Sequence, residues 1–413
     1  MSLRKLGALL FALLPLQAHA EFGTIDDVPA ATLLIPHFEV DTLNRTGVNT
    51  VITLTNASAS AAVAQVTLWT DEALPTARFG IYLTGYDQQT IDLQNVFNRF
   101  PPVTADAGSD TGDTSNPDDG ISNKGDFSQD INFPGAVPPC SAAPSDIELL
   151  ITYDVKAAHT GLASLNYFGG SCGAINYGDG IARGYVTIDT VTQCTTDSPY
   201  ETAFFPGGIA DRRNILMGSY VISNANGSRM VAANAVHVES RYVAGPAPSY
   251  GLYSSLTNYS TVSEREALPT AWAGRAVAGK TDLNYWRDPG QKITPVAGCA
   301  VPAAFPLPLR DLSVFSGNGT NTANPAGALF PYASGRVAGS ALSLAASPGW
   351  LFANLNSTTD PDPMNATDWN TIRQSWLTFE QYPSSTPATS GFAYTVEGIQ
   401  LGNAADLADP IVP

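Results

Sequence analysis

Thr50-Val51-Ile52-Thr53-Leu54-Thr55 and, shortly after it, Gln65-Val66-Thr67-Leu68-Trp69 are the runs of sequence that decide the fold class. In both runs apolar side chains are interleaved with threonine or glutamine, and a period of two places the two kinds on opposite faces of a β-strand. We therefore predict an antiparallel sheet with one apolar face packed on a core and one polar face exposed to solvent.

The same pattern extends outward from these runs. Alternating segments separated by turn residues occur at 32–40, 49–56, 63–70, 78–84 and 90–93. Such spacing is typical of an antiparallel β-sandwich, and we predict an immunoglobulin-like one. These segments supply fewer strands than the roughly seven of a complete sandwich of that type. We therefore expect the last strands of the chain to return and complete it.

The rest of the chain also reads as strands, separated by long Gly-, Pro- and Asp-rich stretches. Strands are predicted at 147–155, 183–191, 216–223, 230–243, 350–355, 375–381 and 392–401, with a shorter apolar piece at 283–286. Asn226-Gly227 predicts a hairpin between two of them. The predicted architecture is all-β, with a signal peptide at 1–20, a sandwich domain at 21–140 that contains an acidic insertion at 101–139, a second disulfide-containing β domain at 141–345, and strands at 346–413 that complete the first sandwich.

The amino terminus has the three parts of a secretory signal peptide. Arg4 and Lys5 precede an apolar run at 6–16, and Ala18-His19-Ala20 follows. These match the basic, apolar and cleavage regions of such a signal. Because the apolar run is shorter than the roughly 20 residues that cross a bilayer, we predict cleavage after Ala20 and export. A retained membrane anchor is the alternative.

The exported chain is strongly acidic. The net charge of −17 becomes −19 without Arg4 and Lys5, since residues 1–20 contain no acid. Nucleic-acid binders usually carry a basic patch, so this class of function is excluded. An outer-membrane barrel would share the signal and the alternation, but the 30 prolines argue against it, as do many strands shorter than about nine residues. We therefore do not expect an integral membrane protein.

All four cysteines, Cys140, Cys172, Cys194 and Cys299, lie in the exported part. An even number in an oxidising compartment predicts two disulfides, and no pair has the Cys-x-x-Cys spacing of a zinc site. Four cysteines allow three connectivities. We favour Cys140 with Cys172 and Cys194 with Cys299, which would close two separate loops.

The insertion at 101–139 is the strongest compositional signal for a ligand. Calcium takes six to eight oxygen ligands on a backbone that turns sharply, and this segment interleaves aspartates with Gly, Asn and Ser. It lacks the EF-hand spacing. We interpret it as a candidate calcium site, with a solvated loop as the alternative; the ligands would come from Asp106, Asp110, Asp113, Asp118 and Asp119, with Asp126 and Asp130 nearby.

Polar side chains two residues apart share one face of a strand, and three predicted strands carry such groups. They are His37, Glu39 and Asp41; Arg183, Tyr185, Thr187 and Asp189; and His237, Glu239 and Arg241. If the last two strands were neighbours, Asp189, His237 and Glu239 would form a surface able to bind or hydrolyse a substrate. The alternative is the solvated face of an antiparallel sheet.

A tyrosine-rich stretch follows the last of these groups. Tyrosine on loops gives a large amphipathic contact area at low entropic cost. The stretch is therefore a candidate adhesive or saccharide-binding surface, with loop packing as the alternative; its tyrosines are Tyr242, Tyr250, Tyr253 and Tyr259.

Several phrases together resemble a group of exported bacterial proteins, mostly described only as hypothetical or surface-associated. They are Leu33-Leu34-Ile35-Pro36-His37-Phe38, Tyr82-Leu83-Thr84-Gly85-Tyr86-Asp87, Arg183-Gly184-Tyr185-Val186-Thr187-Ile188-Asp189, Val236-His237-Val238-Glu239 and Tyr285-Trp286-Arg287-Asp288. The resemblance spans most of the chain. It implies export and a β architecture, and it carries over no activity and no site.

The sequence thus favours a non-enzymatic structural or binding protein of the periplasm, the cell surface or the exterior. Calcium is its candidate cofactor. Its candidate partners are other envelope or extracellular proteins, a second copy of the chain, or a saccharide. A secreted hydrolase built on Asp189, His237 and Glu239 is the alternative.

Overall fold

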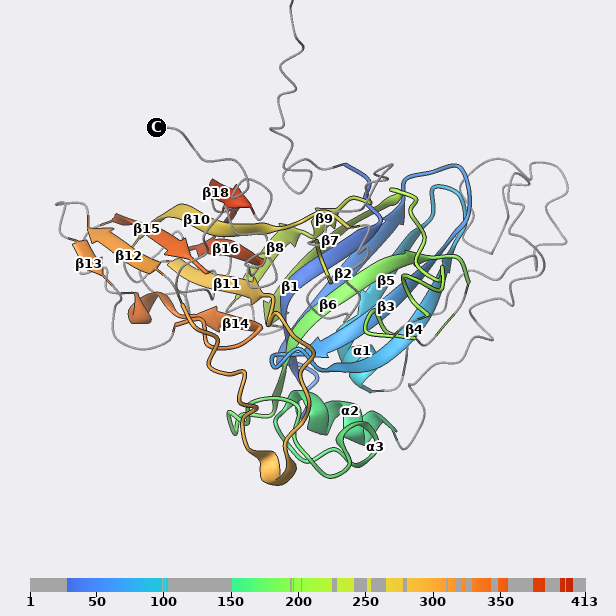
Figure 1. Cartoon of the computed structure of the whole chain (residues 1–413), viewed down its shortest axis with the longest axis horizontal. Helices are drawn as coiled ribbons and strands as arrows, with labels where there is room; N and C mark the ends of the chain where they lie inside the picture. The colour runs from blue at the N-terminus through green and yellow to red at the C-terminus, as the bar shows by residue number, and fades with distance from the viewer. Residues whose placement is uncertain are drawn as a thin grey trace, which may run out of the picture.

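The protein is a mostly β structure with four small antiparallel sheets in its described part, as the sequence predicts (Figure 1). The computed structural model describes residues 28–98, 100, 102, 151–193, 195, 197–201, 203–224, 229–240, 251–253, 265–277, 281–309, 311–316, 321–323, 329–342, 348–355, 374–382, 394–397 and 399–403. The predicted signal peptide lies outside these residues, as does the acidic insertion apart from Pro102.

Two of the sheets face each other and enclose the first core. One has the order β4-β3-β6-β1-β9 and the other β5-β2-β7-β8. The strands of the first are β1 (Thr32–Asp41), β3 (Ala62–Thr70), β4 (Pro75–Leu83), β6 (Ile181–Val191) and β9 (Val236–Val238). Those of the second are β2 (Val48–Asn56), β5 (Gln88–Asp92), β7 (Leu216–Asn224) and β8 (Met230–Asn234). We call this pair the first sandwich.

The other two sheets form a second sandwich. Their orders are β13-β12-β15-β10-β18 and β14-β11-β16-β17. The strands are β10 (Pro269–Ala276), β11 (Thr281–Arg287), β12 (Asp311–Ser316), β13 (Asn321–Ala323), β14 (Ser334–Val337), β15 (Gly349–Asn354), β16 (Ser375–Gln381), β17 (Tyr394–Glu397) and β18 (Ile399–Asn403). Trp272, Leu351 and Phe379 are among the buried side chains between them.

The strand pairing corrects the expected return of the last strands. β15 and β18 pair with β10, and β16 pairs with β11, so strands after residue 346 complete the second sandwich. The first sandwich is completed by β6 to β9 instead. β6 pairs with both β1 and β3, β7 pairs with β2 and β8, and β9 pairs with β1.

Alternation predicts β2 well, but not what covers β3. Every second residue of β2 is buried, as expected for a strand with one solvated face, although Thr50 lies on the buried side and Val51 on the other. In β3 all residues are buried, including Gln65 and Thr67 on the predicted wet face. The reason is that two different segments cover this face of the first sandwich. Trp69 and Tyr185 belong to the second core, whereas Val63 packs with Phe204 and Ile209 of a loop that follows β6.

The described part of the segment predicted as a strand at 147–155, residues 151–155, is instead helical. Helix α2 (Ile151–His159) buries Val155, Ala158 and His159, whereas Tyr153 is exposed, which is helical spacing. The other helices are α1 (Leu93–Phe97), α3 (Leu165–Phe168) and the 3₁₀ turns η2 (Ala297–Cys299) and η3 (Gly339–Ala341). Packing of His159 against the rings of Phe38 and Phe97 stabilises α2 despite its β-branched start.

Two local predictions can be compared directly with the structure. The hairpin across Asn226-Gly227 is confirmed, because β7 and β8 pair from Ser223 with Met230 onward. The favoured disulfide connectivity is wrong, because Cys172 is bonded to Cys299. Sequence spacing gave no reason to bring these two loops together. Cys140 and Cys194 lie outside the described residues.

Candidate functional site

The predicted hydrolase group is not assembled. β1 lies between β6 and β9, so the strands of Asp189 and His237 are not neighbours. Thr32 of β1 lies opposite Asp189 on one side and Val238 on the other, whereas Leu33 lies opposite His237. Directly opposite residues share a face, so Asp189 and His237 lie on opposite faces of the sheet. Glu239, one residue beyond Val238, does not share the face of Asp189 either.

Asp189 belongs to a buried polar cluster whose other members are Thr32, Tyr253 and Arg265. It accepts hydrogen bonds from Thr32 Oγ1 at 2.5 Å and from Tyr253 Oη at 2.9 Å. Arg265 Nε donates to Thr32 Oγ1 at 2.7 Å and lies 4.0 Å from Asp189 Oδ1. Burial raises the pKa of Asp189, and the nearby Arg265 and the two hydrogen bonds offset part of that shift. The cluster fastens the segment around Tyr253 to the sheet.

The other members of the predicted polar surface also have packing partners. His237 Nε2 accepts a hydrogen bond from the backbone N–H of Gly218, on β7 of the opposing sheet, at 3.1 Å. Thr187 accepts one from Trp69 Nε1 at 2.8 Å, and the ring of Tyr185 stacks on that of Trp69. Glu239 is half-buried, and Arg241 lies outside the described residues. The solvated-face interpretation is therefore also wrong for β6, because Tyr185, Thr187 and Asp189 are buried and Arg183 is only partly exposed.

His37 and Glu39 do lie together, but they point into the contact between the two sandwiches. His37 Nδ1 is 3.1 Å from Ser334 Oγ, and its Nε2 is 3.6 Å from Glu39 Oε1. Burial lowers the pKa of His37 despite the neighbouring carboxylate. Asp41, at the end of β1, accepts hydrogen bonds from the backbone of Leu43 and Asn44 and only shapes the following loop.

Glu39 is part of a continuous series of alternating charges, which we call the ion-pair chain. Arg183 binds Asp179 at 2.7 Å and lies 3.9 Å from Glu39. Arg229, beside the β7–β8 hairpin, pairs with Glu39 and donates two hydrogen bonds to Glu380, at 2.8 and 3.0 Å. The chain continues through Arg336 to Asp282, so its members in order are Asp179, Arg183, Glu39, Arg229, Glu380, Arg336 and Asp282.

The electrostatics of the ion-pair chain are those of a matched set. Burial alone would raise the pKa of Glu39, but Arg229 and then His37 hold it well below its usual range. Glu380 is fully buried and also accepts hydrogen bonds from Asn284 and, at 3.0 Å, from Tyr382 Oη. Unpaired buried charges would be costly, so the complementary partners on both sandwiches favour one relative placement.

A carboxyl pair that sequence reasoning missed lies in the turn between β3 and β4. Asp71 and Glu72 are both buried there. Asp71 Oδ1 accepts a hydrogen bond from the backbone N–H of Ile175 at 3.2 Å, and Oδ2 has no hydrogen-bond partner within the described ranges. Burial and the neighbouring Glu72 raise the pKa of Asp71 well above its usual range, and burial raises the pKa of Glu72 to about 7.

This pair can take up and release a proton near neutral pH. Adjacent acids at the end of a strand give no sequence signal, because turn carboxylates are usually solvated. Burial here follows from the fold, since the backbone of Ala333, just before β14, donates to the carbonyl of Asp71 at 2.9 Å. The turn thereby becomes enclosed by the second sandwich.

The other predicted sites are the calcium site in the acidic insertion and the tyrosine-rich saccharide surface. The calcium candidates Asp106, Asp110, Asp113, Asp118 and Asp119 all lie outside the described residues. Elsewhere, in the ranges given above, no group of three or more His, Cys, Asp or Glu side chains could hold a metal ion. Of the four tyrosines of the candidate saccharide surface, only Tyr253 is described, and it is buried against Asp189 rather than presented to solvent.

Comparison with known proteins adds no identity. No protein-family model matches the chain, and no curated protein matches its sequence. Among solved structures, it is similar to an α-L-rhamnosidase of Streptomyces avermitilis complexed with L-rhamnose, at 8% identity and a TM-score of 0.16. That match covers 89% of this chain and 26% of the rhamnosidase, and at so low a TM-score it carries no argument. None of the helices in the described ranges is long and apolar enough to cross a membrane.

Proposed function

We propose that the chain is a non-enzymatic structural or binding protein, exported to the periplasm, the cell surface or the exterior. The proposal rests on the observation that buried polar side chains bind other segments of the same chain. The ion-pair chain and the Asp189 cluster bind neighbouring segments of the same chain, and the group proposed for hydrolysis is divided between two faces of a sheet. These contacts support a scaffold role, and the hydrolase alternative is not favoured.

The amino-terminal sequence and the disulfide both support export. The first 20 residues have the pattern of a cleaved signal, and the Cys172–Cys299 disulfide fits an oxidising compartment. The proposal also includes self-assembly and calcium bound by the acidic insertion. Both are inferred from the sequence. Stabilisation by an ion would suit an acidic scaffold outside the cytoplasm.

The immunoglobulin-like character of the first sandwich is also a proposal. In immunoglobulin domains two consecutive strands pair, one in each sheet, with two later consecutive strands. Here β2 pairs with β5 and β3 pairs with β6, both antiparallel. β1 and β7 occupy the positions beside these pairs, which departs from the standard strand order. The nested pairs support a related topology.

The experiment is expression of the full chain in a bacterium, followed by fractionation, amino-terminal sequencing and activity measurement on the purified product. We expect a mature protein that begins at Glu21, is found outside the cytoplasm, and turns over none of a panel of ester, peptide and glycoside substrates. An unprocessed cytoplasmic product would contradict export. Turnover that Asp189→Asn or His237→Gln abolishes without unfolding the protein would contradict the non-enzymatic role.

A further inference from the structure

One end of the molecule is built from two segments that contain no charged residue. They are residues 160–178, which include α3, and residues 293–309, which include η2. We call them together the apolar tip. In a chain with 37 acidic and 20 basic residues, two uncharged segments that meet in space are a distinct surface. Figure 1 shows the α2–α3 region and the loop that carries η2 at the same end, beyond the sheets.

The tip exposes large apolar side chains. Large apolar side chains are also exposed away from the tip segments, for example Trp350 and Phe352 on β15. At the tip the exposed fractions are 47% for Leu162, 74% for Leu165, 50% for Tyr177, 38% for Val296 and 47% for Val301. Exposed apolar patches on exported proteins typically mark contact with a partner or a membrane.

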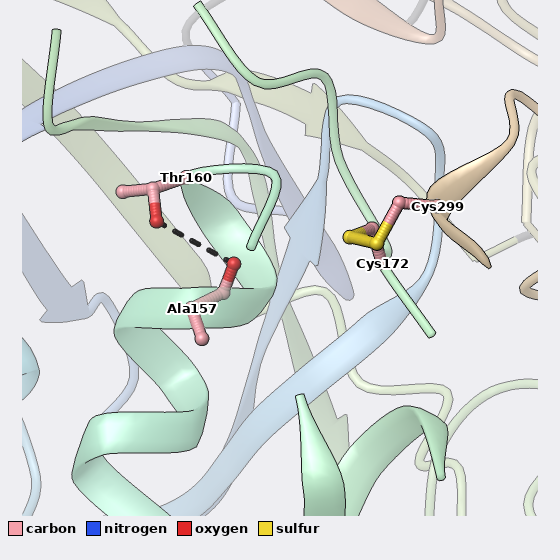
Figure 2. The surroundings of a disulfide bond; sticks show 4 residues. All are labelled: Ala157, Thr160, Cys172 and Cys299. Carbon is pink, nitrogen blue, oxygen red and sulfur yellow. Dashed lines mark hydrogen bonds between the residues drawn. A yellow bond between two sulfur atoms is a disulfide. The ribbon is translucent and has the colours of Figure 1, made fainter. Parts of the chain in front are cut away.

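The two segments are held together covalently. Cys172 of the first is bonded to Cys299 of the second, and Cys172 also forms an isolated backbone bridge with Val296. Figure 2 shows the disulfide close to the end of α2, where Thr160 donates a hydrogen bond to the carbonyl of Ala157. The apolar side chains are therefore presented by a preformed surface, which lowers the entropic cost of binding.

Among the described residues, the charged side chains that flank the tip are mainly basic or already paired. Arg45 and Lys292 are exposed, and the Lys292 ammonium also lies 5.5 Å from the centre of the Tyr200 ring. Lys156 donates to Asn98 at 2.9 Å. Asp179, which directly follows the first segment, is paired with Arg183 at 2.7 Å. Basic residues around an apolar patch favour an anionic surface, in contrast to the acidity of the chain as a whole.

The composition of the tip favours lipid over a protein partner. A stable protein interface buries about 800 Å² on each partner and has a polar rim as well as an apolar centre. Uncharged segments that carry exposed apolar side chains enter the headgroup region of a lipid surface without the cost of burying a charge. Tyrosine is also enriched at such interfaces.

We propose that the apolar tip docks the protein onto a lipid surface, with Leu162, Leu165 and Val301 entering the headgroup region and Arg45 and Lys292 facing the lipid phosphates. This names the partner for the envelope-binding role proposed above and rests on that role. The two proposals can be refuted independently, because export is tested by cell fractionation and docking is tested with purified protein and vesicles.

The test is co-sedimentation of the oxidised mature protein with vesicles of phosphatidylcholine mixed with phosphatidylglycerol. We expect the protein to sediment with the vesicles, and Leu162→Ser combined with Leu165→Ser to weaken the partition about tenfold or more. The matched control is Trp350→Ser combined with Phe352→Ser, which removes two exposed apolar side chains from β15 and should leave partition unchanged. Val301→Ser tests the other segment, so the proposal does not depend on the folding of one variant.

Three results would overturn the proposal. The first is wild-type protein that stays in the supernatant at every vesicle concentration. The second is an equal loss of partition in the tip variant and in the β15 control. The third is a dimer, detected by sedimentation velocity without vesicles, that the tip variant dissociates, since the tip would then bind protein.

Discussion

Replacement of Arg229 by methionine should destabilise the protein by about 3 kcal/mol at neutral pH. Arg229 contacts Glu39 and Glu380, whose side chains are 8% and 0% exposed, and methionine keeps much of its length but none of its charge. Removing one partner from a buried ion pair costs roughly 3–5 kcal/mol. We expect the lower end, because Arg183 remains 3.9 Å from Glu39 and Arg336 remains 3.9 Å from Glu380.

The loss should depend on pH in a defined direction. The folded-state pKa of Glu39 lies well below its ordinary value of 4.5. Its contribution to the free energy of unfolding is therefore complete above that ordinary value and disappears as the pH falls through the folded-state pKa. The difference between wild type and Arg229→Met should hold from neutral pH down to about 4.5 and shrink in stronger acid.

The assay is urea unfolding followed by tryptophan fluorescence at several pH values. Arg275→Met is the matched control, because Arg275 is an exposed arginine on β10, and surface substitutions usually change stability by less than about 0.5 kcal/mol. If Arg229→Met costs no more than Arg275→Met at neutral pH, the buried charges do not stabilise the fold and the reasoning is refuted.

Three further predictions concern separate features. Burial raises the pKa of Glu72 to about 7, so its ionisation should destabilise the fold as the pH rises from about 4.5 through 7; Glu72→Gln should melt higher than wild type at pH 8 but not at pH 4, and equal melting at both values would contradict this account. Peptide mapping under non-reducing conditions should recover Cys172 linked to Cys299, and Cys299→Ser should lower stability by about 2–5 kcal/mol; a Cys140–Cys172 peptide would show the structure to be wrong. If the acidic insertion holds calcium, a chelator should lower the melting temperature, since an ion bound only by the folded state stabilises it, and identical melts would remove calcium from the proposal.

Alternation along the sequence predicts the β class and most strands, since it reports directly which side chains one strand buries. β2 illustrates this, with every second residue buried and bounds within a residue of those expected. β16 also has the expected bounds, although it is buried on both faces. The segment that became α2 was misassigned because its Ile, Thr, Tyr and Val residues favour strands, and packing against Phe38 and Phe97 overrides that preference.

The polar sites were harder to predict, because a strand does not reveal what covers its polar face. Gln65, Thr67 and Asp189 read as a wet surface, yet all three are buried. The segment of Tyr253 and the loop of Phe204 lie over parts of that face. Whether Asp189 and His237 meet depends on strand order, and β1, from far earlier in the chain, lies between them. Glu39, Arg229 and Glu380 are separated by more than a hundred residues each, so only the assembled fold makes them partners.

A double-mutant cycle between Arg229 and Glu380 tests most directly whether buried charges join the two sandwiches. The four proteins are wild type, Arg229→Met, Glu380→Gln and the double variant, and the quantity measured is the free energy of unfolding at neutral pH. The contact of Arg229 Nη2 with both carboxylate oxygens of Glu380, at 2.8 and 3.0 Å, should give a coupling energy of about 2 kcal/mol, within the range seen for residues of one buried network. Additive losses, with a coupling below about 0.5 kcal/mol, would contradict the account.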